Sequence, residues 1–455
     1  MTYDYLQLDK NSDVPLYRQL YLCVRTAVES GHLRENSRLP SVRRLAGDLS
    51  LSCTTVEAAY QQLCVEGYIR SSPQRGYFTL NVRRDGPERK PAPPAFRRAP
   101  VRPVRYNFGS DCVDIGETDI KIWRRNVRTA LNRQDVLASY GDHQGEPELR
   151  EALSSYSYGA RGVVAQPEQI VIGAGTQPLL SLFCGLTGPE RASVAMEDPG
   201  FPQAEQVFAD FGISVLKLPC DEDGIRMDAL ERSGARLVYV SPSNRVRTGS
   251  CIPMSRRMEL LNWAARTGGV IIEDDYNGEL RYRARPVPAM QGIAGGRGVV
   301  YVGSFSKLLL PSVRIGYMAL TPELLARYLP RAANCNQTAS KVEQLALAEY
   351  IRSGQMERHL RRLRKLYGTK SESLIRALRR AFGSRAEILL QETPLTLILT
   401  LHTRKSADEL CRLALEKSVR VQPAEGGRVL LGFAGIPLED IGGAVQHLKD
   451  AWSGI

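Results

Sequence analysis

The 455-residue sequence predicts an α/β protein in which a small helical module precedes a large domain built on a mainly parallel sheet. Two observations support this prediction. From residue 106 onward, apolar runs typical of buried strands alternate with helical patterns, which is the order that builds a parallel sheet with helices on both faces. Before residue 81 the order differs, because helical segments come first and two short alternating strands follow them.

The composition limits the class of protein. A chain of this length is expected to hold two or three domains, and an apolar content of 43% is enough for their cores. No apolar stretch approaches the length of a membrane span, and the first residues lack a signal-peptide pattern, so we expect a cytoplasmic protein with no membrane partner. Nine cysteines without CxxC spacing favour reduced thiols and argue against disulfides or a metal site.

Positive charge is concentrated in the N-terminal part of the chain. The formal net charge is +12, and residues 1–105 hold 17 Lys and Arg against 10 Asp and Glu. Less than a quarter of the chain therefore carries more than half of the excess. This asymmetry predicts a basic N-terminal module with an anionic partner.

Residues 1–80 show the pattern of a winged helix-turn-helix. One helical pattern covers 15–30, a short helix is expected over 42–49, and a tight turn leads into another helix from about 53 to 66. Two short alternating strands near 68 and 78 then form a hairpin. Two short helices at a tight turn, followed by a hairpin, place the second helix in the major groove of DNA.

Three strings in this module resemble the GntR-type DNA-binding domain: LPSVRRLA at 39–46, LSCTTV at 51–56 and LCVEGYI at 63–69. The resemblance implies that the second helix faces DNA and that the wing enters the minor groove. Hydroxyls and arginines around the helix hold phosphates in such modules. The residues predicted to contact DNA are Arg38, Ser41, Arg43, Arg44, Ser52, Thr54, Thr55, Arg75 and Gly76.

Cys53 departs from this pattern. Many members of the family have an arginine there, and cysteine cannot make the bidentate contact that arginine makes to guanine. We therefore expect different or weaker base readout at this position.

Residues 81–105 predict a linker. Prolines and arginines alternate through the segment, and such a composition cannot bury a core. An extended tether is expected, and its charge also suits contact with DNA phosphates.

The large domain is expected over 106–455. Its predicted strands are 169–172, 193–196, 214–217, 237–241, 270–272, 299–302 and 317–320. Ligands of mainly parallel sheets bind at the carboxyl ends of the strands. The candidate site residues of this domain directly follow the predicted strands.

Three of these strand ends carry groups suited to a planar, phosphorylated ligand. A glycine-rich loop at 173–175 opens a helix at Thr176, and backbone N–H groups at a helix N-terminus bind phosphate. Phe201 follows the next strand and presents a ring for stacking. Asp274 and Tyr276 follow the strand at 270–272 and point to the same side. Each feature alone is more common as core, cap or solvated surface.

The fourth strand end delivers a lysine. The strand at 299–302 breaks at a glycine into Ser304, Phe305 and Ser306, and then comes Lys307. A lysine at the end of a buried strand is partly desolvated, which favours the neutral amine that Schiff-base chemistry needs. Arg314 and the hydroxyls nearby suit a phosphate. Taken alone, a lysine at a strand end more often only extends its amine to solvent.

The order of these motifs resembles that of a pyridoxal-phosphate (PLP) enzyme of fold type I, and residues from about 106 onward resemble a class I aminotransferase. The string YGDHQGEPELR at 140–150 resembles the YxxxxG segment of that family, and SPSNRVRTG at 241–249 resembles its NPTG loop. With the winged helix and the linker in front, the whole chain resembles MocR-type regulators within the GntR superfamily.

The resemblance implies a role for each residue of the site. Lys307 would form the internal aldimine with PLP, Asp274 would pair with the pyridine nitrogen, Tyr276 would contact the phenolic oxygen, and Phe201 would stack on the ring. Phosphate would be bound by Gly175, Thr176, Ser304 and Arg314, and by Tyr140 of a neighbouring subunit. Arg428 is the implied clamp for an effector carboxylate, with Arg420 as the second candidate. Because Val246 cannot form the hydrogen bond of the NPTG asparagine, either Asn244 or Arg245 replaces it or that hydrogen bond is missing.

The predicted function is that of a PLP-binding transcriptional regulator that senses an amine, an amino acid or PLP itself. A homodimer on double-stranded DNA with paired half-sites is expected, because the implied site uses a tyrosine of the neighbouring subunit. The first alternative is a catalytically active aminotransferase with an accessory DNA-binding domain. The second is a repressor whose large domain serves only for dimerisation.

Overall fold

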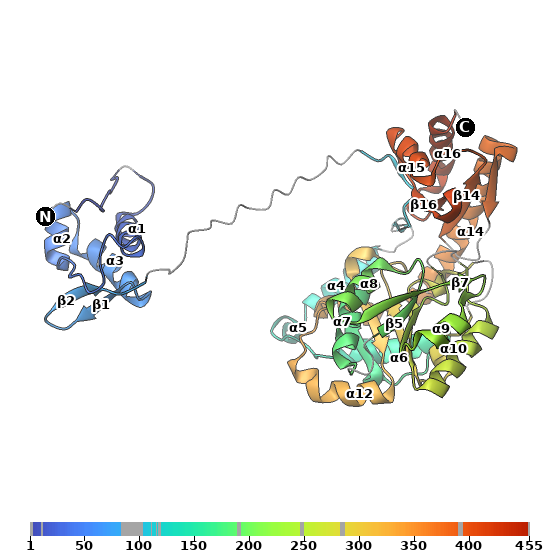
Figure 1. Cartoon of the computed structure of the whole chain (residues 1–455), viewed down its shortest axis with the longest axis horizontal. Coiled ribbons are helices and arrows are strands. Elements are labelled where there is room, and N and C mark those ends of the chain that lie inside the picture. Colours follow the sequence, from blue (N-terminus) through green and yellow to red (C-terminus); the bar gives the residue numbers. More distant parts are fainter. Residues whose placement is uncertain are drawn as a thin grey trace. The chain divides into compact units, whose positions relative to one another are not determined.

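Figure 1 shows the computed structural model of the chain, which describes residues 3–10, 12–82, 103–110, 112–114, 116, 120–188, 193–245, 250–282, 287–389 and 395–453. The chain forms two compact units, residues 1–99 and residues 100–455. The predicted linker lies outside the described residues except at its two ends.

The N-terminal unit is a winged helix-turn-helix, as predicted. Its helices are α1 (Leu16–Glu29), α2 (Val42–Leu49) and α3 (Cys53–Val65), followed by the antiparallel hairpin β1 (Ile69–Ser72) and β2 (Gly76–Thr79). Two hydroxyls fix where the second and third helices begin, since Ser41 accepts from the Arg44 N–H at 3.3 Å and Ser52 from the Thr55 N–H at 3.1 Å. The core of the unit contains Leu20, Val56, Tyr60 and Leu63, all fully buried.

The second unit is organised around a seven-stranded sheet in the order β4-β12-β11-β10-β9-β5-β6. The bounds are β4 (Ile170–Gly173), β5 (Ser193–Glu197), β6 (Ser214–Leu218), β9 (Leu237–Val240), β10 (Val270–Asp275), β11 (Val299–Ser304) and β12 (Gly316–Ala319). Only β12 runs antiparallel to its neighbours in this sheet. The prediction of a mainly parallel sheet built from these seven segments is confirmed.

Helices cover both faces of this sheet, because alternate residues of its strands enter different cores. Ile271 of β10 packs in the same core as Trp263, whereas Ile272 packs with Leu180 and Phe183. The helices of this region are α4 (Ile120–Leu131), α5 (Gln134–Leu137), α6 (Pro147–Arg161), α7 (Thr176–Leu186), α8 (Pro202–Asp210), α9 (Met227–Ser233), α10 (Met254–Thr267), α11 (Met290–Ile293), α12 (Pro322–Tyr328) and α13 (Lys341–Arg352). A small hairpin, β7 (Cys220–Asp221) and β8 (Gly224–Ile225), follows β6.

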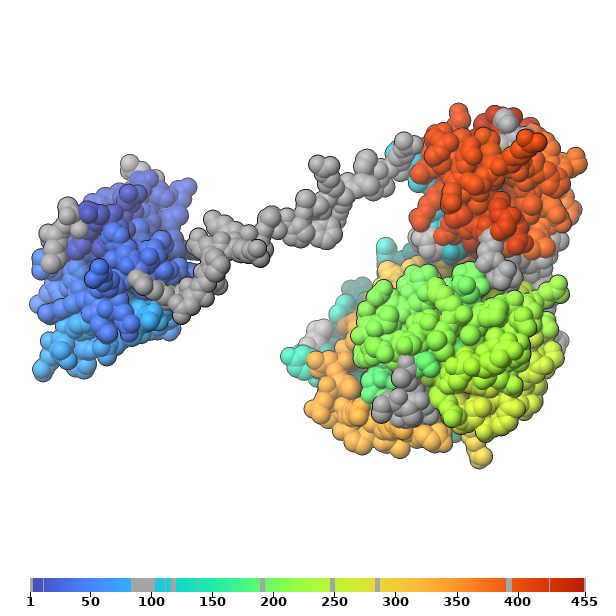
Figure 2. Space-filling view, in the orientation of Figure 1, coloured from blue at the N-terminus to red at the C-terminus, as the bar shows by residue number. Residues whose placement is uncertain are grey.

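The chain ends in a second lobe that the sequence patterns did not reveal, shown in orange and red in Figure 2. It holds the long helix α14 (Gln355–Phe382), an antiparallel sheet in the order β13-β14-β17-β16, and the helices α15 (Ala407–Glu416) and α16 (Ile441–Ala451). The strands are β13 (Ala386–Leu389), β14 (Thr396–Leu401), β16 (Gln422–Ala424) and β17 (Arg428–Gly432).

The segment that follows the linker is attached to this lobe. Its strand β3 (Tyr106–Asn107) pairs in parallel with β15 (Val419–Arg420). A little further on, the buried Lys370 of α14 forms an ion pair with Asp114 and also donates to the Ala434 carbonyl at 2.9 Å. Residues 103–110 and 112–114 are therefore held at several points by the C-terminal part of the chain.

Within the described residues, no helix is long and apolar enough to cross a membrane. All nine cysteines are free thiols.

One prediction concerns Gly145, which has φ +111° and would place a Cβ 2.6 Å from the Cβ of Ile172. Gly145→Ala should lower the free energy of unfolding by more than about 1 kcal/mol, because it adds backbone strain and a clash. The matched control is Gly159→Ala, since Gly159 lies inside α6 with open space around it, and this change should stabilise by about 0.5–1 kcal/mol. Thermal unfolding of both variants tests the pair, and equal melting temperatures would contradict the prediction.

Candidate cofactor site and nucleic-acid interface

The sheet brings four predicted segments to one edge. In the parallel pair β10–β11, Asp274 is opposite Val302 and Asp275 is opposite Gly303, so the ends of both strands lie side by side. Ser304 of β11 is opposite Gly316 of β12, which is in turn opposite Gly173 of β4. The glycine loop, Ser304 and the strand that follows Arg314 are therefore neighbours, although they are far apart in sequence.

Gly175 and Arg314 form a small cradle at this edge. The Arg314 guanidinium donates to the Ala174 carbonyl at 3.3 Å, and a Cβ on Gly175 would lie 2.9 Å from its Nη2 atom. Gly175 has φ +93° and is directly followed by Thr176, the first residue of α7. The guanidinium thus lies beside the N–H groups at a helix N-terminus, an arrangement that binds phosphate.

Asp274 is the least satisfied polar group of the site. Its side chain is buried, and Oδ2 accepts a hydrogen bond from the Tyr239 hydroxyl. Oδ1 is also buried but meets no hydrogen-bond donor among the described residues. Burial raises the pKa of Asp274 to about 7, against the effect of the Tyr239 hydrogen bond, and the Asp275 carboxylate adds to the rise. A buried acceptor without a donor is costly, and a protonated ring nitrogen would satisfy it.

The loop that differs from the NPTG pattern places Asn244 beside Tyr276. The Asn244 side-chain amide donates to the Tyr276 hydroxyl, which lies 3.3 Å from the Asn244 carbonyl. Arg245 is directed elsewhere, because it forms a buried ion pair with Glu197 at 2.9 Å and donates to the Glu222 carbonyl. Of the two residues considered, Asn244 is the one that lies against the predicted cofactor contacts. Val246 lies outside the described residues.

Two buried arginines that the sequence patterns missed hold this loop. Arg161, the last residue of α6, forms an ion pair with Asp275 at 2.6 Å and donates to the Ser243 hydroxyl at 2.5 Å. Arg257 of α10 donates to the carbonyls of Pro242 at 3.0 Å and Ile252 at 2.9 Å. In the sequence, the only indication of this role is that each arginine lies on the buried face of its helix. That position can be interpreted only when the hydrogen-bond partners are known.

Lys307 lies in the turn after β11 and is partly buried. Its amine donates to the carbonyl of Ser110, in the segment that follows the linker. Ser304 accepts from the Ser306 N–H at 3.3 Å, which shapes the turn. Phe201 is partly buried and precedes α8, where it packs against the core on the α7–α8 face of the sheet.

Two predicted residues are not brought to the sheet edge. Tyr140 is fully exposed on the surface of this chain. Arg428 begins β17, whereas the other end of that strand, Gly432, meets the segment that contacts Lys307, since a Cβ there would lie 2.6 Å from the Gly109 carbonyl. Three residues of β17 lie between Arg428 and Gly432, so their Cα atoms are about 13 Å apart along the strand.

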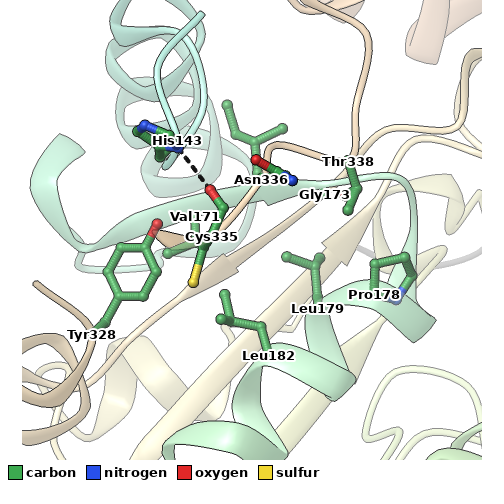
Figure 3. A pocket seen from close by; sticks show the side chains of 11 residues that line it. His143, Val171, Gly173, Pro178, Leu179, Leu182, Tyr328, Cys335, Asn336 and Thr338 are labelled. Carbon is green, nitrogen blue, oxygen red and sulfur yellow. Dashed lines mark hydrogen bonds between the residues drawn. The ribbon is translucent and has the colours of Figure 1, made fainter. Parts of the chain in front are cut away.

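A cavity of about 170 Å³ lies behind the glycine loop (Figure 3). Leu179, Leu182 and Val171 line it with apolar groups, and the buried Tyr328 hydroxyl at its wall has no hydrogen-bond partner among the described residues. The His143 ring contacts the Cys335 carbonyl at 2.7 Å, which closes one side. None of the predicted cofactor residues lines this cavity.

Most of the residues predicted to contact DNA are exposed on the N-terminal unit. Arg38, Arg43, Arg44, Thr54 and Arg75 are exposed. The wing is close to Arg38, because a Cβ on Gly76 would lie 3.7 Å from its Nε atom. The hydroxyls at the start of α3 are linked, since the Ser52 hydroxyl lies 2.8 Å from that of Thr54 and 2.7 Å from that of Thr55. These hydroxyls therefore order the helix start as well as facing outward.

Comparison with known proteins matches both units. Residues 16–79 match the family of bacterial regulatory proteins of the gntR type, and residues 109–448 match aminotransferase class I and II. The chain is 36% identical to the uncharacterised HTH-type transcriptional regulator YdeL of Bacillus subtilis, over 98% of both chains. It is 32% identical to the probable rhizopine catabolism regulatory protein MocR of Rhizobium meliloti, over 98% of this chain and 96% of that protein. The chain belongs to the MocR-type regulators of the GntR family.

The fold of the large unit of this MocR-type chain is that of PLP-dependent aminotransferases. The solved structure of LysN, an alpha-aminoadipate aminotransferase of Thermus thermophilus, matches with a TM-score of 0.67 and 27% identity, over 76% of this chain and 92% of that one. The orphaned Asp274 oxygen and the Gly175–Arg314 cradle are consistent with the cofactor of that fold.

The raised pKa of Asp274 predicts a pH-dependent stability of the cofactor-free protein. Because the folded pKa of about 7 exceeds the ordinary value near 4, stability should fall as pH rises from about 4 through 7. Asp274→Asn removes this penalty, so the variant should become more stable than the wild type above pH 7, by up to about 4 kcal/mol at about 1.4 kcal/mol for each pKa unit.

Glu279→Gln is the matched control for Asp274→Asn, because burial also raises the pKa of Glu279 to about 7. Both variants should flatten the pH profile in denaturant unfolding, but only Asp274→Asn should weaken PLP binding. Parallel pH profiles for the wild type and Asp274→Asn would refute the assignment.

A further prediction concerns Arg43, which is exposed on α2. Arg43→Ala should weaken DNA binding about equally for all sequences and reduce the salt dependence by about one phosphate contact. Arg25→Ala, on α1, is the control, because Arg25 pairs with Glu29 at 2.9 Å. Fluorescence anisotropy at several salt concentrations measures both, and equal effects of the two changes would count against the interface.

Proposed function

We propose that the chain is a PLP-binding transcriptional regulator that holds operator DNA with the winged helix and senses an amine, an amino acid or PLP itself at Lys307. The observation that carries the proposal is the donor-free, buried Oδ1 of Asp274, at the sheet edge where the strand leading to Lys307 also ends. A carboxylate oxygen left without a donor in a core is expected where a ligand supplies the donor.

Each residue of the edge has a role toward PLP, which when bound supplies an aldehyde that combines reversibly with primary amines. Lys307 provides the amine of the protein, and Asp274 accepts from the ring nitrogen. The Tyr276 hydroxyl, oriented by Asn244, faces the ring substituents. Gly175, Thr176, Ser304 and Arg314 bind the phosphate, with Arg314 supplying the charge.

The link from Lys307 to the DNA-binding unit begins at Ser110. The Lys307 amine donates to the Ser110 carbonyl, and the Ser110 N–H donates to Gln422 at 2.9 Å. A ligand that engages Lys307 competes with that carbonyl, so it favours a different position of residues 103–110. These residues continue directly into the linker. A ligand acts as an effector here because it binds the two positions with different affinity.

A homodimer completes the proposal. Tyr140 is fully exposed on this chain, where it contacts none of the predicted cofactor residues, and a neighbouring copy would give it a partner. Twofold symmetry then implies paired half-sites in the DNA.

Aminotransferase activity remains a second candidate, favoured by the intact Asp274, Tyr276 and Asn244 arrangement. The position of Arg428 weighs against it, because β17 does not carry this arginine to the segment at Lys307. Turnover of an amino donor with a 2-oxo acid, near the rate of about 10 per second typical of enzymes, would establish the enzyme instead.

The proposed function is tested on DNA from the gene's own upstream region. The wild type should bind it with an affinity that changes at least about 5-fold when PLP and one member of an amino-acid panel are added, which corresponds to a coupling of about 1 kcal/mol. Lys307→Ala should bind the same DNA without this response and lose the visible absorbance of protein-bound PLP. A wild type that binds PLP but shows no change in DNA affinity with any ligand would rule out the sensor.

A further inference from the structure

The outer face of α14 carries a continuous row of basic side chains. At about 100° per residue, nine positions of this helix fall on one narrow stripe. They are Arg358, Arg361, Arg362, Lys365, Thr369, Glu372, Arg376, Arg379 and Arg380, and all nine are exposed. We call this set the α14 stripe. It holds seven cations and a single carboxylate, whereas the opposite face of the helix is buried.

Five cations of the α14 stripe have no carboxylate partner among the described residues: Arg361, Lys365, Arg376, Arg379 and Arg380. Elsewhere on the same unit some exposed arginines are paired with carboxylates, whereas Arg124, Arg125 and Arg128 of α4 are exposed and have no carboxylate partner among the described residues. Arg232 meets Asp228 at 2.7 Å, and Arg266 meets Glu231 at 2.6 Å. The α14 stripe differs from the α4 arginines in its length, because its cations extend from Arg358 to Arg380 along one helix.

The unpaired row has a cost within the helix. Like charges four residues apart, such as Arg361 and Lys365 or Arg376 and Arg380, destabilise a helix by about 0.2–0.5 kcal/mol for each pair. No described contact offsets this repulsion. A polyanion bound along the stripe would offset it.

The stripe also accounts for the charge of the large unit. Residues 106–455 hold 44 Lys and Arg against 39 Asp and Glu, an excess of +5. The stripe alone contributes +6, so the rest of this segment is close to neutral. From Arg358 to Arg380 the stripe spans about 33 Å at 1.5 Å per residue, close to the length of one turn of B-DNA, about 34 Å.

We propose that the α14 stripe binds the phosphate backbone of double-stranded DNA outside the site contacted by the winged helix. The contact is independent of sequence, because phosphates are its only target. It rests on the proposed function in one respect: DNA held by the winged helix stays at high effective concentration for a second site on the same chain.

The test compares the wild type with a variant that carries Arg361→Gln, Lys365→Gln, Arg376→Gln and Arg380→Gln. Two duplexes share the operator; one is trimmed to the winged-helix footprint and the other has long flanks. The variant should bind the short duplex like the wild type but the long one at least about 10-fold more weakly. Its salt slope on the long duplex should fall by about 0.9 for each phosphate that the variant no longer neutralises.

The control variant carries Arg232→Gln, Arg266→Gln and Arg412→Gln, which remove exposed cations that are paired with carboxylates. It should bind both duplexes like the wild type. An equal loss with control and stripe variants, or an equal loss on short and long duplexes, would overturn the inference, because net charge or damage to the fold would explain it. Unchanged binding of the stripe variant to long DNA would overturn it too, and would leave an acidic protein as the partner.

A third arm separates this inference from the proposed function. On a long duplex of unrelated sequence at low salt, the stripe variant should also bind more weakly than the wild type. This difference supports the α14 stripe even if the operator is not recognised or no effector changes the affinity. Equal binding of the wild type and the stripe variant to this duplex would contradict the inference and would leave the proposed function unaffected.

Discussion

The buried ion pair between Arg161 and Asp275 is the contact on which the candidate site depends. It joins the end of α6 to the end of β10, and the same guanidinium reaches the Ser243 hydroxyl. Asp274 and Asn244 are the direct neighbours of those two partners in the chain. The position of both therefore follows from one arginine. Removing one partner of such a buried pair typically costs about 3–5 kcal/mol, so this geometry is strongly enforced.

This constraint explains how the loop at 241–245 keeps a useful shape without the NPTG pattern. Arg161 and Arg257 hold it from the helices, and Arg245 ties it to Glu197. With its neighbours fixed on both sides, Asn244 remains beside Tyr276. Three arginines thus replace the conformational restriction that a proline in the loop would provide. The loop has changed its sequence but retains an amide next to the tyrosine hydroxyl.

Much of this architecture could be predicted from local sequence patterns, because buried strands and amphipathic helices are determined by short stretches of sequence. The seven strands of the large sheet and the helices and hairpin of the N-terminal unit are examples. The C-terminal lobe was not foreseen, since its short strands at 386–389 and 422–424 alternate exposed and half-buried residues. Arg428 was predicted as a clamp from the family resemblance, whereas its separation along β17 from the segment at Lys307 became visible only in the structure. Distances between elements are set by packing, which no single stretch encodes.

The bond between Lys307 and Ser110 has a consequence for how such a regulator can diverge. Its acceptor is a main-chain carbonyl, which every residue at position 110 would provide. A substitution at this position therefore leaves the hydrogen bond from Lys307 intact. The side chain at 110 is then free to vary. Closely related chains can therefore change this residue and still keep the contact between Lys307 and the segment that follows the linker.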